Sequence, residues 1–532
     1  MAKSGLARMF ARKSVEQMHA EHEQSELKKS LGAVNLVLLG IGCIIGTGIF
    51  VLTGRAAAQF AGPAIMISFV ITGTLCALVA LSYAELASTI PVSGSAYSYS
   101  YASLGELAAW IMGVLLVLEY GLAASTVAVG WSGYVTSFLH DLGLDVAPTL
   151  RGALGTPVSD FTTGATVGTG VVNLPAVVAI AAVTGLLVLG VSESAFVNNI
   201  VVAIKLTVVV AFILIGAFFV NTHLWSPLIP PPQPPPPAGQ SASLWSEIGT
   251  SLWDVLTAQS TGRYGVPGII TGAATIFFAY IGFEAVSTAG AESHNPRRDM
   301  PIGILGSLIV CTILYILTAG VLVGIVPYTD LNDAAPIAKA VNQIGLPWFA
   351  VLVKIGAICG LSSVMLVLLY GQTRIFYTMA RDGLIPPVFA RVHPKFKTPW
   401  INTLVVGVIA CAFAGFMGLD ELANLTNVGT LLAFAIVCFT VVYLRFARPE
   451  VHRPFKTPLF PLTPILGAVM CLFLLMSLMA HPSTRNFFIF YLVGGVLLYF
   501  AYGLWNSKLG KGIVVHGHEE QLTQTPHARV TD

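Results

Sequence analysis

Long apolar stretches alternate with short polar, turn-rich segments along almost the whole chain. A helix needs about 20 predominantly apolar residues to cross a bilayer, whereas the strands of a membrane β-barrel are about 10 residues long and alternate in polarity. The pattern therefore predicts an all-α, polytopic membrane protein with twelve transmembrane helices, at residues 33–53, 62–84, 105–139, 173–192, 195–220, 269–291, 301–325, 348–380, 400–417, 421–446, 460–480 and 487–506.

Lysine and arginine are distributed unevenly between the two sides of the predicted membrane domain. An even number of crossings places both termini on one side, and that side receives twenty of the 27 basic residues. Basic loops stay in the cytoplasm, so we expect both termini in the cytoplasm of a multi-pass protein of the cell (inner or plasma) membrane. The opposite side has five basic residues: Arg55, Arg151, Arg263, Lys339 and Arg485.

The apolar stretches divide the chain into segments with different expected roles. A proline-rich loop on the extracytoplasmic side contains Pro230–Pro232 and Pro234–Pro237, whose composition favours extended polyproline-type chain. This loop is either a spacer or a docking strip. The expected order is a cytoplasmic tail (1–30), five helices (31–220), the proline-rich loop (221–266), five helices (267–448), two helices (449–506) and a cytoplasmic tail (507–532).

Composition argues against several classes of function. Only 10% of residues are charged and the net charge is +2, so no nucleic-acid surface is expected. All seven cysteines fall in apolar stretches, and all eleven histidines fall in loops, tails or helix ends. This distribution favours neither disulfides nor a metal centre nor a nucleophilic catalytic site, and no phosphate-binding loop for ATP is present. We therefore expect neither an enzyme nor a cofactor.

Two of the apolar stretches carry helix-breaking residues near their centres. The first contains Gly46-Thr47-Gly48, and the sixth contains Gly282 directly before Phe283-Glu284. Glycine also allows close packing of membrane helices, but these stretches hold the same place in two sets of five. Interrupted helices at corresponding positions indicate an inverted-repeat transporter with its site at the midplane. Freed amides hold a carboxylate and freed carbonyls hold an ammonium, so a zwitterionic amino acid fits.

Several motifs, in order from the first to the eighth stretch, resemble those of the amino acid–polyamine–organocation (APC) superfamily. They are Gly46-Thr47-Gly48-Ile49-Phe50, Pro91–Tyr97, Phe283-Glu284-Ala285, Asn295–Pro301 and Arg381–Leu384. The chain is most similar to bacterial homologues of the cationic amino acid transporter (CAT) family. This resemblance implies a LeuT-type fold, a 5+5 inverted repeat with helices 1 and 6 broken and two peripheral helices, and a secondary active amino acid permease.

The resemblance also implies which main-chain groups bind the substrate. The Thr47 and Gly48 amides, next to Gly46, would hold the carboxylate. The Phe278 ring would close over the ligand. The substrate's ammonium would be held by the main-chain carbonyls of Ile44, Phe278, Ala279 and Ile281.

Four ionisable residues within the predicted helices are candidates for a role, because charge in the bilayer is costly and functional roles are common there. By resemblance, Lys205 occupies the sodium position of related transporters, bridges to helices 1 and 8, and serves as the proton-coupling group, with protons as the coupling ion. Glu119 is either a structural acid or a pathway residue. Glu284 either caps the second half of helix 6 or faces the pathway, and Lys354 is expected to snorkel outward.

The choice of substrate rests on helix 8, which is bulky and apolar around Val367 and Leu368. A cationic side chain needs a paired or solvated site, so we expect small or medium neutral L-amino acids as substrates. The resemblance implies that they are carried by proton symport through alternating access. The alternative is a transporter or exchanger of arginine and lysine, with Glu119 as partner, while a sensor or channel is less favoured. In heteromeric relatives, a cysteine in the external loop after helix 3 forms a disulfide with a glycoprotein subunit. Residues 140–172 contain no cysteine, so we do not expect this linkage. The sequence does not indicate whether a small single-helix subunit binds.

Overall fold

The structure is a computed structural model that describes residues 8–13, 31–92, 94–161, 165–190, 195–233, 263–511, 513–516 and 519–522. The prolines at 234–237, most of the predicted N-terminal tail and half of the predicted C-terminal tail lie outside the described residues. Within these ranges, nine helices are long and apolar enough to cross a membrane, and Ala33–Ile44, Leu174–Val188 and Trp400–Phe416 are shorter apolar helices. The chain is thus a mostly helical, polytopic membrane protein.

Within the described residues, each predicted stretch contains helix, and the first and the sixth are interrupted. The α-helices are α3 (Ala33–Ile44), α4 (Thr53–Ala56), α5 (Ile65–Thr89), α6 (Ser95–Ser103), α7 (Glu106–Asp141), α8 (Leu174–Val188), α9 (Ala195–Gly216), α11 (Gly265–Ile276), α12 (Pro296–Ile325), α13 (Pro336–Gln343), α14 (Pro347–Arg381), α15 (Trp400–Phe416), α16 (Leu419–Ala447), α17 (Leu462–Met479), α18 (Pro482–Leu498) and α19 (Leu504–Asn506). Two small antiparallel hairpins pair β1 (Pro157–Ser159) with β2 (Thr166–Thr169) and β3 (Ile513–His516) with β4 (Glu519–Leu522).

Both predicted helix breaks are present. Helix α3 ends at Ile44, and the chain continues after Gly46 into a π-helical turn, Gly48–Leu52. Helix α11 ends at Ile276, passes through a 3₁₀ turn, Phe277–Tyr280, and resumes as a 3₁₀ segment, Glu284–Glu292. Gly282 lies between these two segments with a φ of 124°, a conformation that glycine adopts without steric cost.

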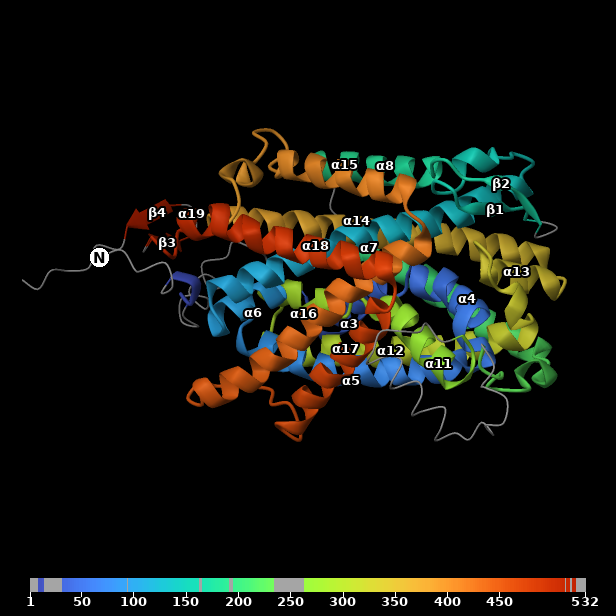
Figure 1. The fold of residues 1–532 in the computed structure, drawn as a ribbon, viewed down its shortest axis with the longest axis horizontal. Helices are drawn as coiled ribbons and strands as arrows, with labels where there is room; N and C mark the ends of the chain where they lie inside the picture. The colour runs from blue at the N-terminus through green and yellow to red at the C-terminus, as the bar shows by residue number, and fades with distance from the viewer. Residues whose placement is uncertain are drawn as a thin grey trace, which may run out of the picture.

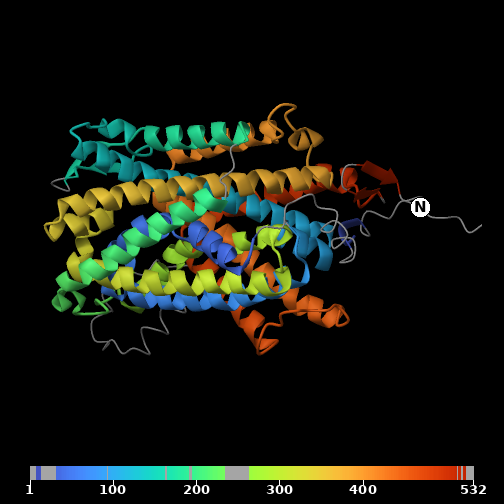
Figure 2. The same cartoon turned by 180° about the vertical axis from the view of Figure 1, so that it is seen from behind.

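Three pairs of helices that are five positions apart in the predicted order pack against each other. Helix α7 contacts α14, α5 contacts α12, and α8 contacts α15. The two broken segments follow the same rule, since the turn Gly48–Leu52 contacts the turn Phe277–Tyr280. Figures 1 and 2 both show α8 and α15 together along one edge of the molecule, outside α7 and α14.

Large apolar side chains point outward from the peripheral helices. Leu214 on α9, Val408 on α15 and Phe490 on α18 are 62%, 69% and 78% exposed. Exposed apolar side chains on neighbouring helices mark a surface that contacts membrane or protein. In a chain of this hydropathy, they are expected to face lipid.

Candidate functional site

The two helix breaks lie in direct backbone contact at the centre of the structure. A Cβ atom added to Gly48 would lie 2.2 Å from the Ala279 Cα, so only glycine fits at this position. The hydroxyl of Tyr315 on α12 bridges the breaks, because it lies 2.7 Å from the carbonyl oxygen of Ile44 and 3.0 Å from that of Ala279. Tyr315 therefore donates its proton to the carbonyls of both breaks.

The predicted substrate residues surround this contact. The Ile281 N–H donates to the Phe278 carbonyl over 3.2 Å, and both side chains are buried. Three carbonyls assigned to the substrate's ammonium, those of Ile44, Phe278 and Ala279, thus already accept a hydrogen bond each. A carbonyl oxygen has a second lone pair, so each retains capacity for a ligand.

Gly46 and Thr47 face two different helices, α14 and α7. A Cβ on Gly46 would lie 3.5 Å from Val364 of α14, an ordinary contact, so Val364 faces the first break from helix α14. The Thr47 side chain instead packs on Gly130 of α7. Its buried hydroxyl oxygen has no hydrogen-bond partner among the described residues.

Further polar side chains satisfy main-chain groups that the breaks release. The Asn427 side-chain amide on α16 donates to the carbonyls of Ala274 and Thr275, at 2.9 and 3.1 Å, near the end of α11. The Tyr134 hydroxyl donates to the Phe50 carbonyl over 2.8 Å. Sequence analysis did not identify these two residues or Tyr315, although a lone asparagine in an apolar helix is a signal that could have done so.

Lys205 is fully buried on α9 and connects three helices. Its Nζ donates to the Gly42 carbonyl of α3 over 2.7 Å. A Cβ on Gly360 of α14 would lie 2.9 Å from the Lys205 Cγ, so the lysine stem packs tightly on α14. Lys205 is therefore positioned to link the segment before the first break to helices α9 and α14.

Glu119 on α7 and Glu284 after the second break are buried neighbours whose carboxyl groups interact. Glu284 accepts the Gly282 N–H over 2.8 Å, as its predicted capping role requires. Its second oxygen and both oxygens of Glu119 have no hydrogen-bond partner among the described residues. Two buried carboxylates in contact repel each other, and one proton on the pair removes that repulsion.

Lys354 does not snorkel outward as predicted. It is buried, and its Nζ donates to the Asp141 carboxylate over 2.6 Å and to the Ser137 carbonyl over 3.2 Å. The sequence prediction was wrong because α7 extends to Asp141, which brings a carboxylate beside the first turns of α14. This pair fastens α14 to the end of α7.

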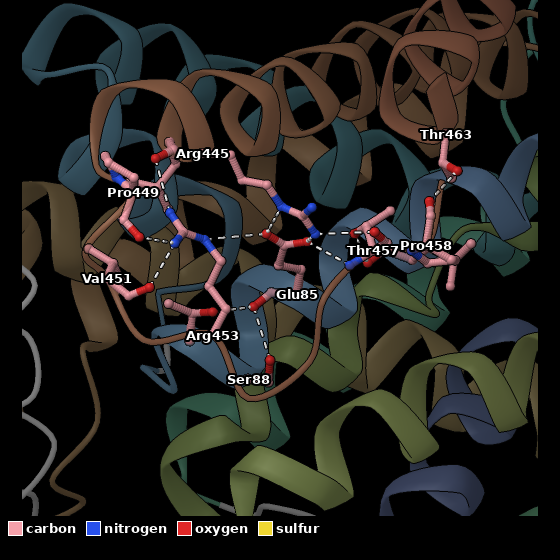
Figure 3. Close-up of polar contacts among 12 residues, drawn as sticks. Glu85, Ser88, Arg445, Pro449, Val451, Arg453, Thr457, Pro458 and Thr463 are labelled. Carbon is pink, nitrogen blue, oxygen red and sulfur yellow. Dashed lines mark hydrogen bonds and ion pairs between the residues drawn. The ribbon is translucent and has the colours of Figure 1, made fainter. Parts of the chain in front are cut away.

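A second polar cluster joins α5 to the segment after α16 (Figure 3). The buried Glu85 carboxylate accepts two hydrogen bonds from Arg445, at 2.8 and 2.5 Å, and one from the Thr457 N–H at 2.7 Å. Arg453 lies 3.5 Å from the same carboxylate and donates to four main-chain carbonyls. Because each of these charged groups has a partner within the cluster, we interpret the cluster as structural: it connects α5 to the end of α16 and to the segment that follows.

A cavity of about 60 Å³ lies between α6, α7, α14 and the Glu284–Glu292 segment. Val367 lines it, whereas Leu368 does not and is buried in the core. Tyr120 and Ala285, the residues that follow Glu119 and Glu284, also line it. The cavity therefore lies between residues next in sequence to the two acids and the Arg374 end of α14.

The part of the chain that the structure describes contains no group of three or more histidine, cysteine, aspartate or glutamate residues that could hold a metal ion. The chemistry at the breaks is instead that of main-chain amides and carbonyls, two acids and one lysine.

Comparison with known proteins assigns the family. The sequence model of a family described as "amino acid permease" matches residues 31–498. The chain belongs to this family. It is 42% identical to the methylthioribose transporter of Bacillus subtilis, over 95% of this chain and 100% of that protein. It is also 42% identical to the branched-chain amino acid permease BcaP of B. subtilis, over 94% and 99%.

More distant relatives confirm the resemblance to cationic amino acid transporters. The vacuolar cationic amino acid transporter 4 of Arabidopsis thaliana is 37% identical, over 83% of this chain and 68% of that protein. The family and these relatives indicate a membrane transporter of the APC superfamily and not an enzyme.

Proposed function

We propose that this permease is a secondary active amino acid transporter that works by alternating access. The fold proposed for it is a LeuT-type 5+5 inverted repeat followed by two helices, twelve crossings in all. The contacts of α5 with α12, α7 with α14 and α8 with α15, together with the contact between the two breaks, support this arrangement, because these elements then pack on their counterparts in the other repeat.

The observation that carries the proposal is the contact between the two breaks. Gly48 and Ala279 touch, and Tyr315 spans the carbonyls of Ile44 and Ala279. Main-chain amides and carbonyls thus converge at one point inside an apolar protein, which suits a zwitterion. The test is uptake of labelled L-alanine and L-valine into proteoliposomes. Saturable uptake supports the proposal, and uptake no greater than in protein-free liposomes contradicts it.

Proton coupling is the finer part of the proposal, with Lys205 as the coupling group. The Lys205 ammonium donates a hydrogen bond to the Gly42 carbonyl over 2.7 Å, close to the first break. In its charged form, the lysine would therefore fix the position of α3 relative to α9. Burial disfavours the charged form of a lysine, so that loss of its proton weakens this link. The buried pair of Glu119 and Glu284 is a second place where a proton can reside.

Lys205→Ala tests this assignment. We expect the variant to lose accumulation driven by an imposed pH gradient while it keeps exchange of internal for external substrate. The purified variant must remain monodisperse, which separates loss of coupling from misfolding. Accumulation at the wild-type level would contradict the role of Lys205.

For the substrate, we propose small or medium neutral L-amino acids. The name of one relative, a branched-chain amino acid permease, agrees with this choice. The apolar Val364, which faces the first break, also favours a neutral side chain. The alternative is a cationic amino acid paired with Glu119, in line with the names of the more distant relatives.

The proposed location is the cell membrane, with both termini in the cytoplasm. Lys13 pairs with Asp382 at 2.9 Å, and the Lys508 N–H donates to the Asp382 carbonyl over 3.0 Å, so both described ends of the chain meet at one end of α14. That end carries most of the lysine and arginine, which favours the cytoplasmic side.

A further inference from the structure

The cavity beside α14 runs from a half-exposed mouth to a buried floor. Arg374 is the one charged residue among those that line it in the described part of the chain. Arg374 is 39% exposed and marks the mouth; Glu292, which is 32% exposed and does not itself line the cavity, lies beside Arg374. Tyr120 and Ala285 are almost fully buried and form the floor. The cavity thus lies between the buried segment that follows the second break and the end of α14 that carries Arg374.

The two charged groups at the mouth are paired only loosely. The Arg374 Nη1 lies 3.9 Å from the Glu292 Oε1, whereas a charge-assisted hydrogen bond measures about 2.7–2.9 Å. Ion pairs with this degree of exposure contribute little to stability, so their separation costs little. Both groups therefore have hydrogen-bonding capacity for a ligand that carries the opposite charges.

Other contacts hold each charged group in place. The Arg374 guanidinium lies over the Tyr370 ring, 4.4 Å from its centroid. The main-chain carbonyl of Glu292 accepts the Leu31 N–H over 3.0 Å, just before α3. Such contacts limit the side-chain and main-chain freedom that a ligand would otherwise have to remove on binding.

The remaining lining favours an apolar side chain. Leu116, Val367 and Ile375 provide apolar walls. The hydroxyls of Thr288 and Thr378 already donate to main-chain carbonyls, at 2.7 and 2.9 Å. The cavity thus offers one cation and an apolar wall, and the Glu292 carboxylate lies beside its mouth.

We propose that this cavity is a second, inner binding site for the zwitterion of a neutral amino acid on its way to or from the cytoplasm. Arg374 binds the carboxylate and Glu292 binds the ammonium, so the ligand replaces one loose ion pair by two close ones. The proposal rests on the proposed transport function. It adds a site on the release pathway, apart from the site at the helix breaks.

The test compares transport from the two faces of the membrane. Labelled L-valine uptake is measured in intact cells, where the outer face is loaded, and in inside-out vesicles, where the cytoplasmic face is loaded. We expect Arg374→Gln and, separately, Glu292→Gln to raise the half-saturating concentration about tenfold at the cytoplasmic face, with less than a twofold change at the outer face.

Arg381→Gln is the matched control. Arg381 lies two turns further along α14, stacks on Tyr377 and does not line the cavity, so its replacement should change neither value. Equal changes at both faces, a change confined to the outer face, or no change in either cavity variant would overturn the inner site. If the unmodified protein transports no amino acid, the proposed function itself fails, which is a different outcome.

Discussion

Replacement of Gly48 by alanine tests whether the contact between the helix breaks forms the transport site. The added methyl group would lie 2.2 Å from the Ala279 Cα and 2.3 Å from its Cβ. Carbon atoms that are not bonded normally approach to about 3.5–4.0 Å. The two broken helices would therefore have to separate by about 1.5 Å, judged from this contact distance.

The size of the expected effect follows from this clash. Extra methylene groups in a packed core cost about 1–3 kcal/mol, and a clash with main chain belongs near the upper end. At about 1.4 kcal/mol for each tenfold change, a cost of 3 kcal/mol corresponds to roughly a 100-fold loss of affinity. The Gly48→Ala variant should therefore show little or no saturable binding and a lowered melting temperature.

The assay is binding of labelled L-valine to purified protein in detergent, together with thermal unfolding. Gly46→Ala is the control for alanine placed in the break without a clash, because its methyl group would lie 3.5 Å from Val364, an ordinary contact distance. Gly185→Ala on α8 has no atom within 4 Å and serves as the neutral control. If Gly48→Ala binds valine as tightly as the unmodified protein, the breaks do not form the site.

Three more predictions follow from other contacts. Tyr315→Phe removes the hydroxyl shared by two break carbonyls and should weaken valine binding about fivefold, the value of one hydrogen bond, and unchanged affinity would contradict a positioning role. Glu85→Gln leaves the buried Arg453 and the partly buried Arg445 without their acid and should lower the free energy of unfolding by about 3 kcal/mol, whereas the exposed Arg448→Gln should not change the melting temperature. In competition assays, L-alanine should inhibit valine uptake better than L-arginine. Strong arginine uptake by the unmodified protein would favour the cationic alternative.

The membrane fold could be predicted largely from the sequence because hydrocarbon imposes a simple rule on each segment. Every main-chain polar group must be satisfied within the helix, so the length of an apolar stretch alone predicts a crossing. The same rule made Gly46–Gly48 and Gly282 detectable as places where the helices break. Lys205 was detectable because a charged side chain so deep in an apolar stretch has a high free-energy cost unless the protein supplies a partner.

Partners supplied by distant helices could not be predicted in this way. The charge of Lys354 suggested a side chain that reaches for the membrane surface, yet Asp141 of α7 pairs with it. Val367 lines the inner cavity while Leu368, the next residue, packs into the core. A single sequence does not show which face of α14 points inward, because the helix is apolar on all sides.

By itself, the sequence determined the helices, their interruptions, the buried lysine and acids, and the family resemblance. Each of these follows from local composition or a contiguous motif. Only the tertiary structure decided that Tyr315 bridges the two breaks, that Glu119 lies beside Glu284, and that Glu292 lies beside Arg374 of the cavity. These contacts join residues on different helices, and their geometry depends on how the helices pack, which no local pattern specifies.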